Sequence, residues 1–130
     1  MSLQTWKKEF YPHTASSRKA LAKPITHALK KWRGLTDENL KRHNIKTTYL
    51  GNLRDDENNF FVINSNSCTL CKLYINLHCI GCPLYITRKH YACHYPTRNE
   101  DFSPYDSFTV LNNPQPMIKA LELALIQFPE

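Results

Sequence analysis

Two cysteine pairs with the same internal spacing are the residues of this chain best suited to chemistry. Cys68 and Cys71 form one C-x-x-C pair, Cys79 and Cys82 form a second, and Cys93 follows. Because the two pairs lie close together in the chain, four thiolates can converge on one point. A structural zinc ion is held by four such ligands at the corners of a tetrahedron. The spacing therefore predicts a closed zinc site, with zinc as the protein's metal.

The five cysteines allow two ligand sets. In one, both pairs bind the ion; in the other, Cys93 replaces a member of the second pair. His78, His90 and His94 are further candidates because imidazole also binds zinc. Thiolate ligands bind iron as well, so ligand type alone leaves zinc and iron open.

Sequence motifs of catalysis are missing. The chain contains no H-E-x-x-H, no G-x-x-x-x-G-K-[ST] and no G-x-S-x-G. A thioredoxin-type dithiol uses a single C-x-x-C, and a zinc deaminase needs an H-x-E that this chain lacks. We therefore expect a protein that is not an enzyme. The alternatives are an uncertain metal-dependent or redox activity, including electron transfer at iron held by four thiolates.

The chain is basic, and its positive charge is concentrated in the first part of the sequence. It carries 17 Lys and Arg residues against 11 acidic ones, and residues 1–50 hold eleven of the former and three of the latter. This distribution predicts an acidic partner, and nucleic acid is the first hypothesis; a solvated surface is the alternative. The candidate contacts are Arg18, Lys19, Lys23, Lys30, Lys31, Arg33, Lys41, Arg42, Lys46, Arg88 and Lys89.

A protein partner is the second hypothesis. Small zinc domains often serve as rigid interaction modules, here a phage- or host-directed adaptor or inhibitor without catalysis. The aromatic stretches Phe10-Tyr11-Pro12 and Tyr95-Pro96 are candidate anchors for such a partner.

Cysteine usage and hydropathy suggest where the chain works. An odd number of cysteines, two C-x-x-C pairs and no apolar segment near Met1 favour a reducing, cytoplasmic location. No apolar run approaches the length of a membrane span, so no membrane partner is expected. The length of 130 residues predicts one zinc-binding domain, residues 1–130.

Helical periodicity and capping residues predict that helices dominate the fold. Ile25, Leu29 and Trp32 recur at helical spacing and predict a buried face, with Lys30 and Lys31 pointing away from it. The expected helices are Leu3–Phe10 after a Ser2 cap, Pro24 to the stop at Gly34, Asp37–His43 after Thr36, Pro104 to about Leu111 after Ser103, and Gln115–Phe128.

Strands are expected to be few and short. Lys46–Leu50 is a predicted strand, Phe60–Ile63 is a predicted buried strand, and a further short strand is expected around Tyr85 and Ile86. Gly51–Asn59 reads as an exposed polar turn whose acids are solvated, and Ser67 caps a short helix from Cys68. The expected fold class is α+β: a mainly helical single domain with short strands around a zinc-knuckle site.

The cysteine motifs also carry a resemblance. The run C-T-L-C, C-I-G-C-P-L and a later cysteine, followed by S-P-Y and P-M-I-K-A-L, resembles small cysteine-rich proteins of unknown function from bacteria and phages. The N-terminal W-K-K-E-F-Y-P and K-K-W-R-G-L belong to the same pattern, so the resemblance covers most of the chain. It implies a cytosolic metal-bound domain with five cysteines, and it implies no activity, substrate or catalytic residue.

Overall fold

The computed structural model describes residues 2–11, 24–48, 51–63, 83–88, 91, 93–98 and 100–127. Its helices are α1 (Leu3–Phe10), α3 (Pro24–Arg33), α4 (Asp37–Arg42), α6 (Pro83–Thr87), α7 (Pro104–Leu111) and α8 (Gln115–Gln127). Its strands are β1 (Lys46–Thr47), β2 (Asn52–Arg54) and β3 (Phe60–Val62). The fold is therefore α+β and mainly helical, as the sequence predicts.

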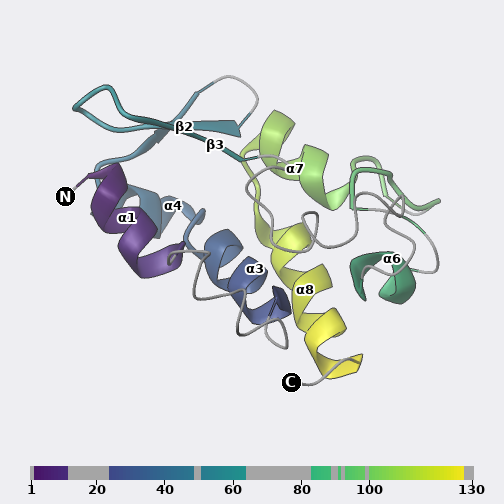
Figure 1. Cartoon of the computed structure of the whole chain (residues 1–130). Coiled ribbons are helices and arrows are strands. Elements are labelled where there is room, and N and C mark those ends of the chain that lie inside the picture. The colour runs from purple at the N-terminus through teal and green to yellow at the C-terminus, as the bar shows by residue number, and fades with distance from the viewer. Residues whose placement is uncertain are drawn as a thin grey trace.

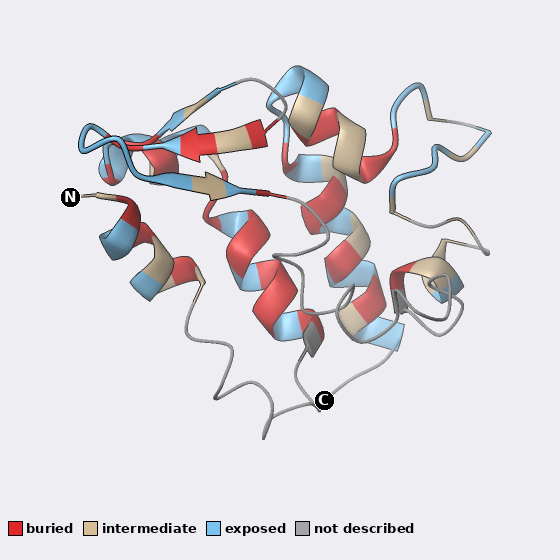
Figure 2. Ribbon diagram, turned by 45° about the horizontal axis from the view of Figure 1, so that its top comes forward, coloured by how far each residue is buried: buried red, intermediate tan, exposed pale blue. Residues whose placement is uncertain are grey.

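Helices α3 and α8 form the centre of the structure (Figure 1). α8 also packs against α6 and α7, and α1 packs against α3. Buried residues run along α3 and α8 in Figure 2; they include Trp32 and Leu121, and Phe108 of α7 packs edge-on against Trp32. The predicted buried face of the second helix is confirmed, because Ile25, Leu29 and Trp32 are all within this core.

The three strands form one antiparallel sheet in the order β1-β2-β3. Its middle row pairs Thr47 with Leu53 and Leu53 with Phe61. Leu53 is fully buried, and the ring of Phe61 lies 5.8 Å from that of Trp6 on α1. One face of the sheet thus packs on the helices, on the side where α1 and α4 lie in Figure 1.

Polar caps set the helix ends where the sequence places them. Ser2 forms a capping box with Thr5, and the hydroxyls of Thr36 and Ser103 accept backbone N–H groups at the starts of α4 and α7. Asn44 has φ 57°, so the left-handed residue predicted after α4 is confirmed. These local signals depend on neighbouring residues alone, so sequence reasoning finds them.

Two predicted elements are wrong, and a third is a strand as predicted but is not buried: Phe60 and Val62 of β3 are 56% and 44% exposed, because they lie on the face of the sheet opposite to Leu53. β2 lies inside Gly51–Asn59, which was expected to be an exposed turn, because Leu53 packs into the core between outward-facing neighbours. The strand expected around Tyr85 and Ile86 is the helix α6, which buries Leu84 against α8. The short helix predicted from Cys68 and the residues 49–50 of the first predicted strand lie outside the described residues.

Two charged residues expected in solvent are buried. Asp55 is 5% exposed because its carboxylate accepts the N–H of Leu3 at 2.9 Å and the N–H of Asn59 at 2.9 Å. Lys31 is 1% exposed, with its ammonium 5.3 Å from the centre of the Trp32 ring. The predictions of a solvated Asp55 and of an outward-facing Lys31 are therefore corrected. No helix within the described ranges combines the length and apolarity that crossing a bilayer requires.

Candidate functional site

Most of the predicted metal ligands lie outside the described residues: Cys68, Cys71, Cys79 and Cys82, with His78 and His90. Cys93 is described, and it is half-buried and packs against the hydrophobic core. His94 is exposed beside Tyr95, with 4.4 Å between the ring centres. Among the described residues, His, Cys, Asp and Glu nowhere gather in a group of three fit to hold a metal ion.

The loop that carries Cys93 is fastened to α6 by Arg88. The guanidinium of Arg88 donates to the carbonyls of Tyr91 at 3.1 Å and Tyr95 at 2.8 Å, and to the carboxylate of Glu100 at 2.7 Å. Its side chain is only 8% exposed. Arg88 was predicted to contact nucleic acid, whereas its donors are directed into the protein and hold this loop.

The same loop is also held by α7, at Cys93 between the two carbonyls that Arg88 binds. The N–H of Tyr105 donates to the carbonyl of Cys93 at 3.1 Å, and the Tyr105 hydroxyl donates to the carbonyl of Ile63 at 3.0 Å. α6 begins at Pro83, the residue directly after Cys82, and both α6 and α7 pack against α8. The residue that follows Cys82 and the loop of Cys93 are therefore each attached to a helix that packs against α8.

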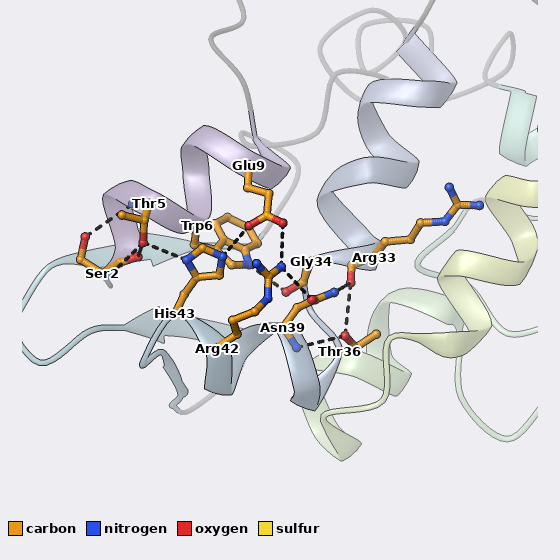
Figure 3. Close-up of polar contacts among 10 residues, drawn as sticks. All are labelled: Ser2, Thr5, Trp6, Glu9, Arg33, Gly34, Thr36, Asn39, Arg42 and His43. Atoms are coloured by element: carbon orange, nitrogen blue, oxygen red, sulfur yellow. Dashed lines mark hydrogen bonds and ion pairs between the residues drawn. The ribbon is translucent and has the colours of Figure 1, made fainter.

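A polar network joins α4 to α1 (Figure 3). Arg42 donates to the carboxylate of Glu9 at 2.6 Å, and the other oxygen of Glu9 lies 2.7 Å from Nε2 of His43. The hydrogen bond from Arg42 lowers the pKa of Glu9, and the same bond raises the pKa of Arg42. Arg42, a predicted nucleic-acid contact, is thus already partnered by a carboxylate.

Thr5 completes this network, and its position argues for a structural role. The Thr5 hydroxyl lies 2.8 Å from Nδ1 of His43, which gives a hydroxyl–imidazole–carboxylate series with Glu9. The hydroxyl, however, also donates to the carbonyl of Ser2 and accepts its N–H, both at 2.8 Å, as part of the α1 cap. His43 is buried edge-on against the Phe10 ring. We therefore assign these contacts to holding α1 and α4 together.

Of the remaining predicted basic contacts, some lie on the surface and others lie outside the described residues. Lys30, Lys41 and Lys46 are exposed, and Arg33 is half-exposed in an ion pair with Glu122 at 3.2 Å. Arg18, Lys19, Lys23 and Lys89 lie outside the described residues.

The outward-facing residues of β2 and β3 are a feature that sequence reasoning missed. Lys46 pairs with Arg54, and Arg54 pairs with Phe60, so the three form one cross-strand row. The Arg54 guanidinium lies 4.6 Å from the centre of the Phe60 ring. Alternation in Asn52-Leu53-Arg54, with the apolar residue inward, was the signal that could have located this strand.

The predicted aromatic anchors differ in burial: some pack inside the protein and one is exposed to solvent. Phe10 is 9% exposed and packs against Trp6, so its prediction as an exposed anchor is corrected. Tyr11 is half-buried against Phe61, with 5.0 Å between ring centres. Tyr95 is 59% exposed, which keeps it accessible to a partner.

Comparisons with protein families, with curated proteins and with solved structures find no significant match to this chain. The resemblance of the cysteine pattern to small bacterial and phage proteins accordingly stays a prediction.

Proposed function

We propose that this protein is a zinc-stabilised nucleic-acid-binding protein that acts by contact rather than by catalysis. One observation carries the binding part of the proposal. Lys30, Lys41, Lys46 and Arg54 are exposed, and within the described ranges none of them forms an ion pair with an acidic side chain. These cations are free to meet phosphates, in contrast to Arg33 and Arg42.

Binding of this kind is driven by the release of counterions from the nucleic acid. The logarithm of the binding constant falls linearly with the logarithm of the salt concentration, with a slope of about −0.9 per phosphate contact on duplex DNA and about −0.7 on single strands. Four exposed cations would thus give a slope of about −3.6 on duplex DNA and about −2.8 on single strands, before any contribution from residues outside the described ranges. Lysine and arginine contacts to phosphate carry little sequence information, so we expect weak selectivity.

The zinc part of the proposal rests on the chemistry of the donor set. Two C-x-x-C pairs supply four thiolates, which suit a closed tetrahedral ion. We favour Cys68, Cys71, Cys79 and Cys82 as the ligands, because Cys93 packs against the core and its carbonyl is held by Tyr105. Bound zinc would tie the segment of the two pairs to α6 through Pro83.

The decisive test is a salt titration of binding to generic nucleic acid. Purified full-length protein would be titrated into fluorescently labelled DNA and RNA, single-stranded and duplex, from 20 to about 300 mM salt, a range over which such contacts weaken steeply. We expect binding at low salt that weakens with the slope given above. Lack of affinity for all four substrates at low salt contradicts the proposal.

A protein partner is the second candidate, and exposed apolar and aromatic side chains favour it. Leu123 and Ile126 on the outer side of α8 are 55% and 76% exposed, and Tyr95 is 59% exposed. Apolar side chains exposed in this way suit a protein contact. Pull-down from nuclease-treated lysate, compared between the wild-type protein and an Ile126→Ser variant, tests it. A partner that both capture equally does not use this surface.

A further inference from the structure

We infer that the outer sheet face, formed by Lys46, Asn52, Arg54, Phe60 and Val62, binds single-stranded nucleic acid by stacking a base on Phe60. The inference rests on the proposed function and assigns it a surface and a class of ligand.

The pairing register places these residues on one side of the sheet. Lys46, Arg54 and Phe60 are direct cross-strand partners, and Asn52 pairs with Val62 in the next row on the same side. Directly paired residues of an antiparallel sheet point to the same face, about 5 Å apart. The row therefore presents two cations and an aromatic ring within the span of a few nucleotides.

This side of the sheet faces solvent. Phe60 is 56% exposed and Val62 is 44% exposed, whereas Leu53 in the opposite-facing row is fully buried. In Figure 1, α1 and α4 lie on the other side of the sheet, and α7 lies beyond its end, where Phe108 and Thr109 approach Gly51. A large aromatic side chain held in solvent on a sheet is available to a ligand.

The chemistry of the row matches a single strand. Phe60 offers a flat ring on which an unpaired base can stack, and stacking tolerates any base. The Arg54 guanidinium lies over one face of that ring, 4.6 Å from its centre, so the base would stack on the opposite face while Arg54 reaches the adjoining phosphate, with Lys46 next in the row. Bases in a duplex are already stacked and paired, so a duplex can use the cations but not the ring.

Acidic residues limit the path of the strand. Asp56 and Glu57 are exposed in the turn between β2 and β3. Asp37 and Asp56 line a hollow of about 640 Å³ beside Lys46. Because carboxylates repel phosphates, the strand should cross the outer sheet face from Lys46 towards Phe60 and Val62 and avoid both the turn and the hollow.

The test compares substitutions on the outer sheet face with matched substitutions elsewhere. Binding of the full chain to labelled 15-nucleotide dT and rU strands, and to a 15-base-pair duplex, would be followed by fluorescence anisotropy. Phe60→Leu keeps apolar area but removes the ring, so we expect single-strand affinity to fall about tenfold, with duplex affinity unchanged. Phe60→Tyr should bind as the wild type does. Leu123→Ala, an exposed apolar residue on α8, is the control.

Separate variants test the two cations of the outer sheet face. Lys46→Gln with Arg54→Gln should reduce the single-strand salt slope by about 1.4, the value for two phosphate contacts. The control pair is Arg98→Gln with Lys119→Gln, two exposed cations remote from the sheet in sequence. Circular dichroism and thermal midpoints would establish that each variant is folded.

A direct readout of stacking is independent of affinity. In a Phe60→Trp variant, a base stacked on the indole should quench its fluorescence on adding dT strands, whereas a Val110→Trp variant should be unaffected. Wild-type protein that binds single strands while Phe60→Leu and the double Gln variant bind equally well overturns the inference and leaves the proposed function standing. Wild-type protein that binds no nucleic acid overturns both.

Discussion

The carboxylate of Asp55, in the turn after β2, accepts the backbone N–H of Leu3, the first residue of α1, at 2.9 Å. A side chain from the sheet thus satisfies one of the unpaired donors at the helix N-terminus and places negative charge where the helix dipole favours it. The same carboxylate accepts the N–H groups of Glu57 and Asn59, each at 2.9 Å. Asp55 therefore shapes the turn and docks it on α1.

Acid should weaken the fold through Asp55. The hydrogen bond from Leu3, followed by those from Asn59 and Glu57, lowers the pKa of Asp55 from 3.8 to about 2. Because the folded-state pKa lies below the unfolded value, ionised Asp55 stabilises the folded protein above its ordinary pKa of 3.8. This stabilisation is lost as the pH falls from there towards 2.

The measurement is urea unfolding between pH 7 and pH 2.5, followed by the fluorescence of the buried Trp6 and Trp32. Asp55→Asn should lower the free energy of unfolding at pH 7 and flatten its dependence on pH in the acidic range. Asp56→Asn, in the exposed neighbouring position, should keep the wild-type dependence. Equal pH dependence in wild type and Asp55→Asn would contradict this role.

Gly34 is required by the close approach of Phe10. A Cβ at position 34 would lie 2.7 Å from Cδ2 of Phe10, whereas carbon atoms in contact prefer about 3.5–4.0 Å. Phe10 is buried, and the Gly34 carbonyl accepts the indole N–H of Trp6 at 2.8 Å, so neither side can move away freely. We expect Gly34→Ala to lower the free energy of unfolding by about 1–3 kcal/mol.

A double-mutant cycle checks the cause of that loss. Phe10→Ala removes Cγ and Cδ2 of the opposing side chain, so Gly34→Ala should cost less in the Phe10→Ala background than in the wild type. Additive losses would mean that the destabilisation arises elsewhere.

The cysteines should separate into ligands and a packed thiol. Cys82→Ser should abolish stoichiometric zinc and unfold much of the domain, because structural zinc contributes roughly 10 kcal/mol or more to folding. Cys93→Ser should retain one zinc per chain and lose only modest stability. Elemental analysis and thermal unfolding of both purified variants distinguish them. Loss of zinc in Cys93→Ser would instead place Cys93 in the ligand set, and a metal-free, fully folded wild type would remove the site.

Neighbouring lysines on α3 provide a matched pair for the binding proposal. Lys30 is exposed, whereas Lys31 is 1% exposed. Lys30→Gln should reduce the salt slope of nucleic-acid binding by about 0.7–0.9 with little change in stability. Lys31→Gln should leave the slope unchanged and lower the thermal midpoint, since its side chain is packed inside. An unchanged slope in Lys30→Gln would mean that Lys30 does not contact the nucleic acid.

Local signals made much of the helical architecture predictable. Ser2, Thr36 and Ser103 cap helices through hydrogen bonds to residues three positions away, so the residues involved are visible side by side in the sequence. The left-handed Asn44 belongs to the same class. The buried apolar face of α3 could also be predicted, because the spacing of apolar residues along a helix can be seen in the sequence without knowing the rest of the fold.

The errors arise where distant residues decide the structure. Asp55 lies among Asp56, Glu57 and two asparagines, a composition typical of a solvated turn. Its hydrogen-bond partner, however, is the N–H of Leu3, 52 residues earlier in the chain. Tyr85 and Ile86 follow Leu84 in a short apolar run that suits a strand as well as a helix, and contact with α8 selects the helix. Lys31 is buried next to Trp32 in the packed helices, although the sequence pattern places it on the outer face of α3.

The candidate site was predictable in part. The cysteine spacing identifies a metal-binding pattern without any structure, but the row of Lys46, Arg54 and Phe60 exists only because two hairpin strands pair in one register. A shift of one residue in β2 would turn Arg54 inward and Leu53 outward, so the sequence alone could not place the row.

The packing of α3 against α8 has a consequence for biosynthesis. Residues 24–33 find their main helical partner in residues 115–127, so the part of the apolar side of α3 that α8 covers stays exposed while the ribosome is still making the intervening chain. A nascent polypeptide with that surface uncovered is open to chaperones and to aggregation. Packing around α3 should therefore be completed late, once α8 has emerged from the exit tunnel.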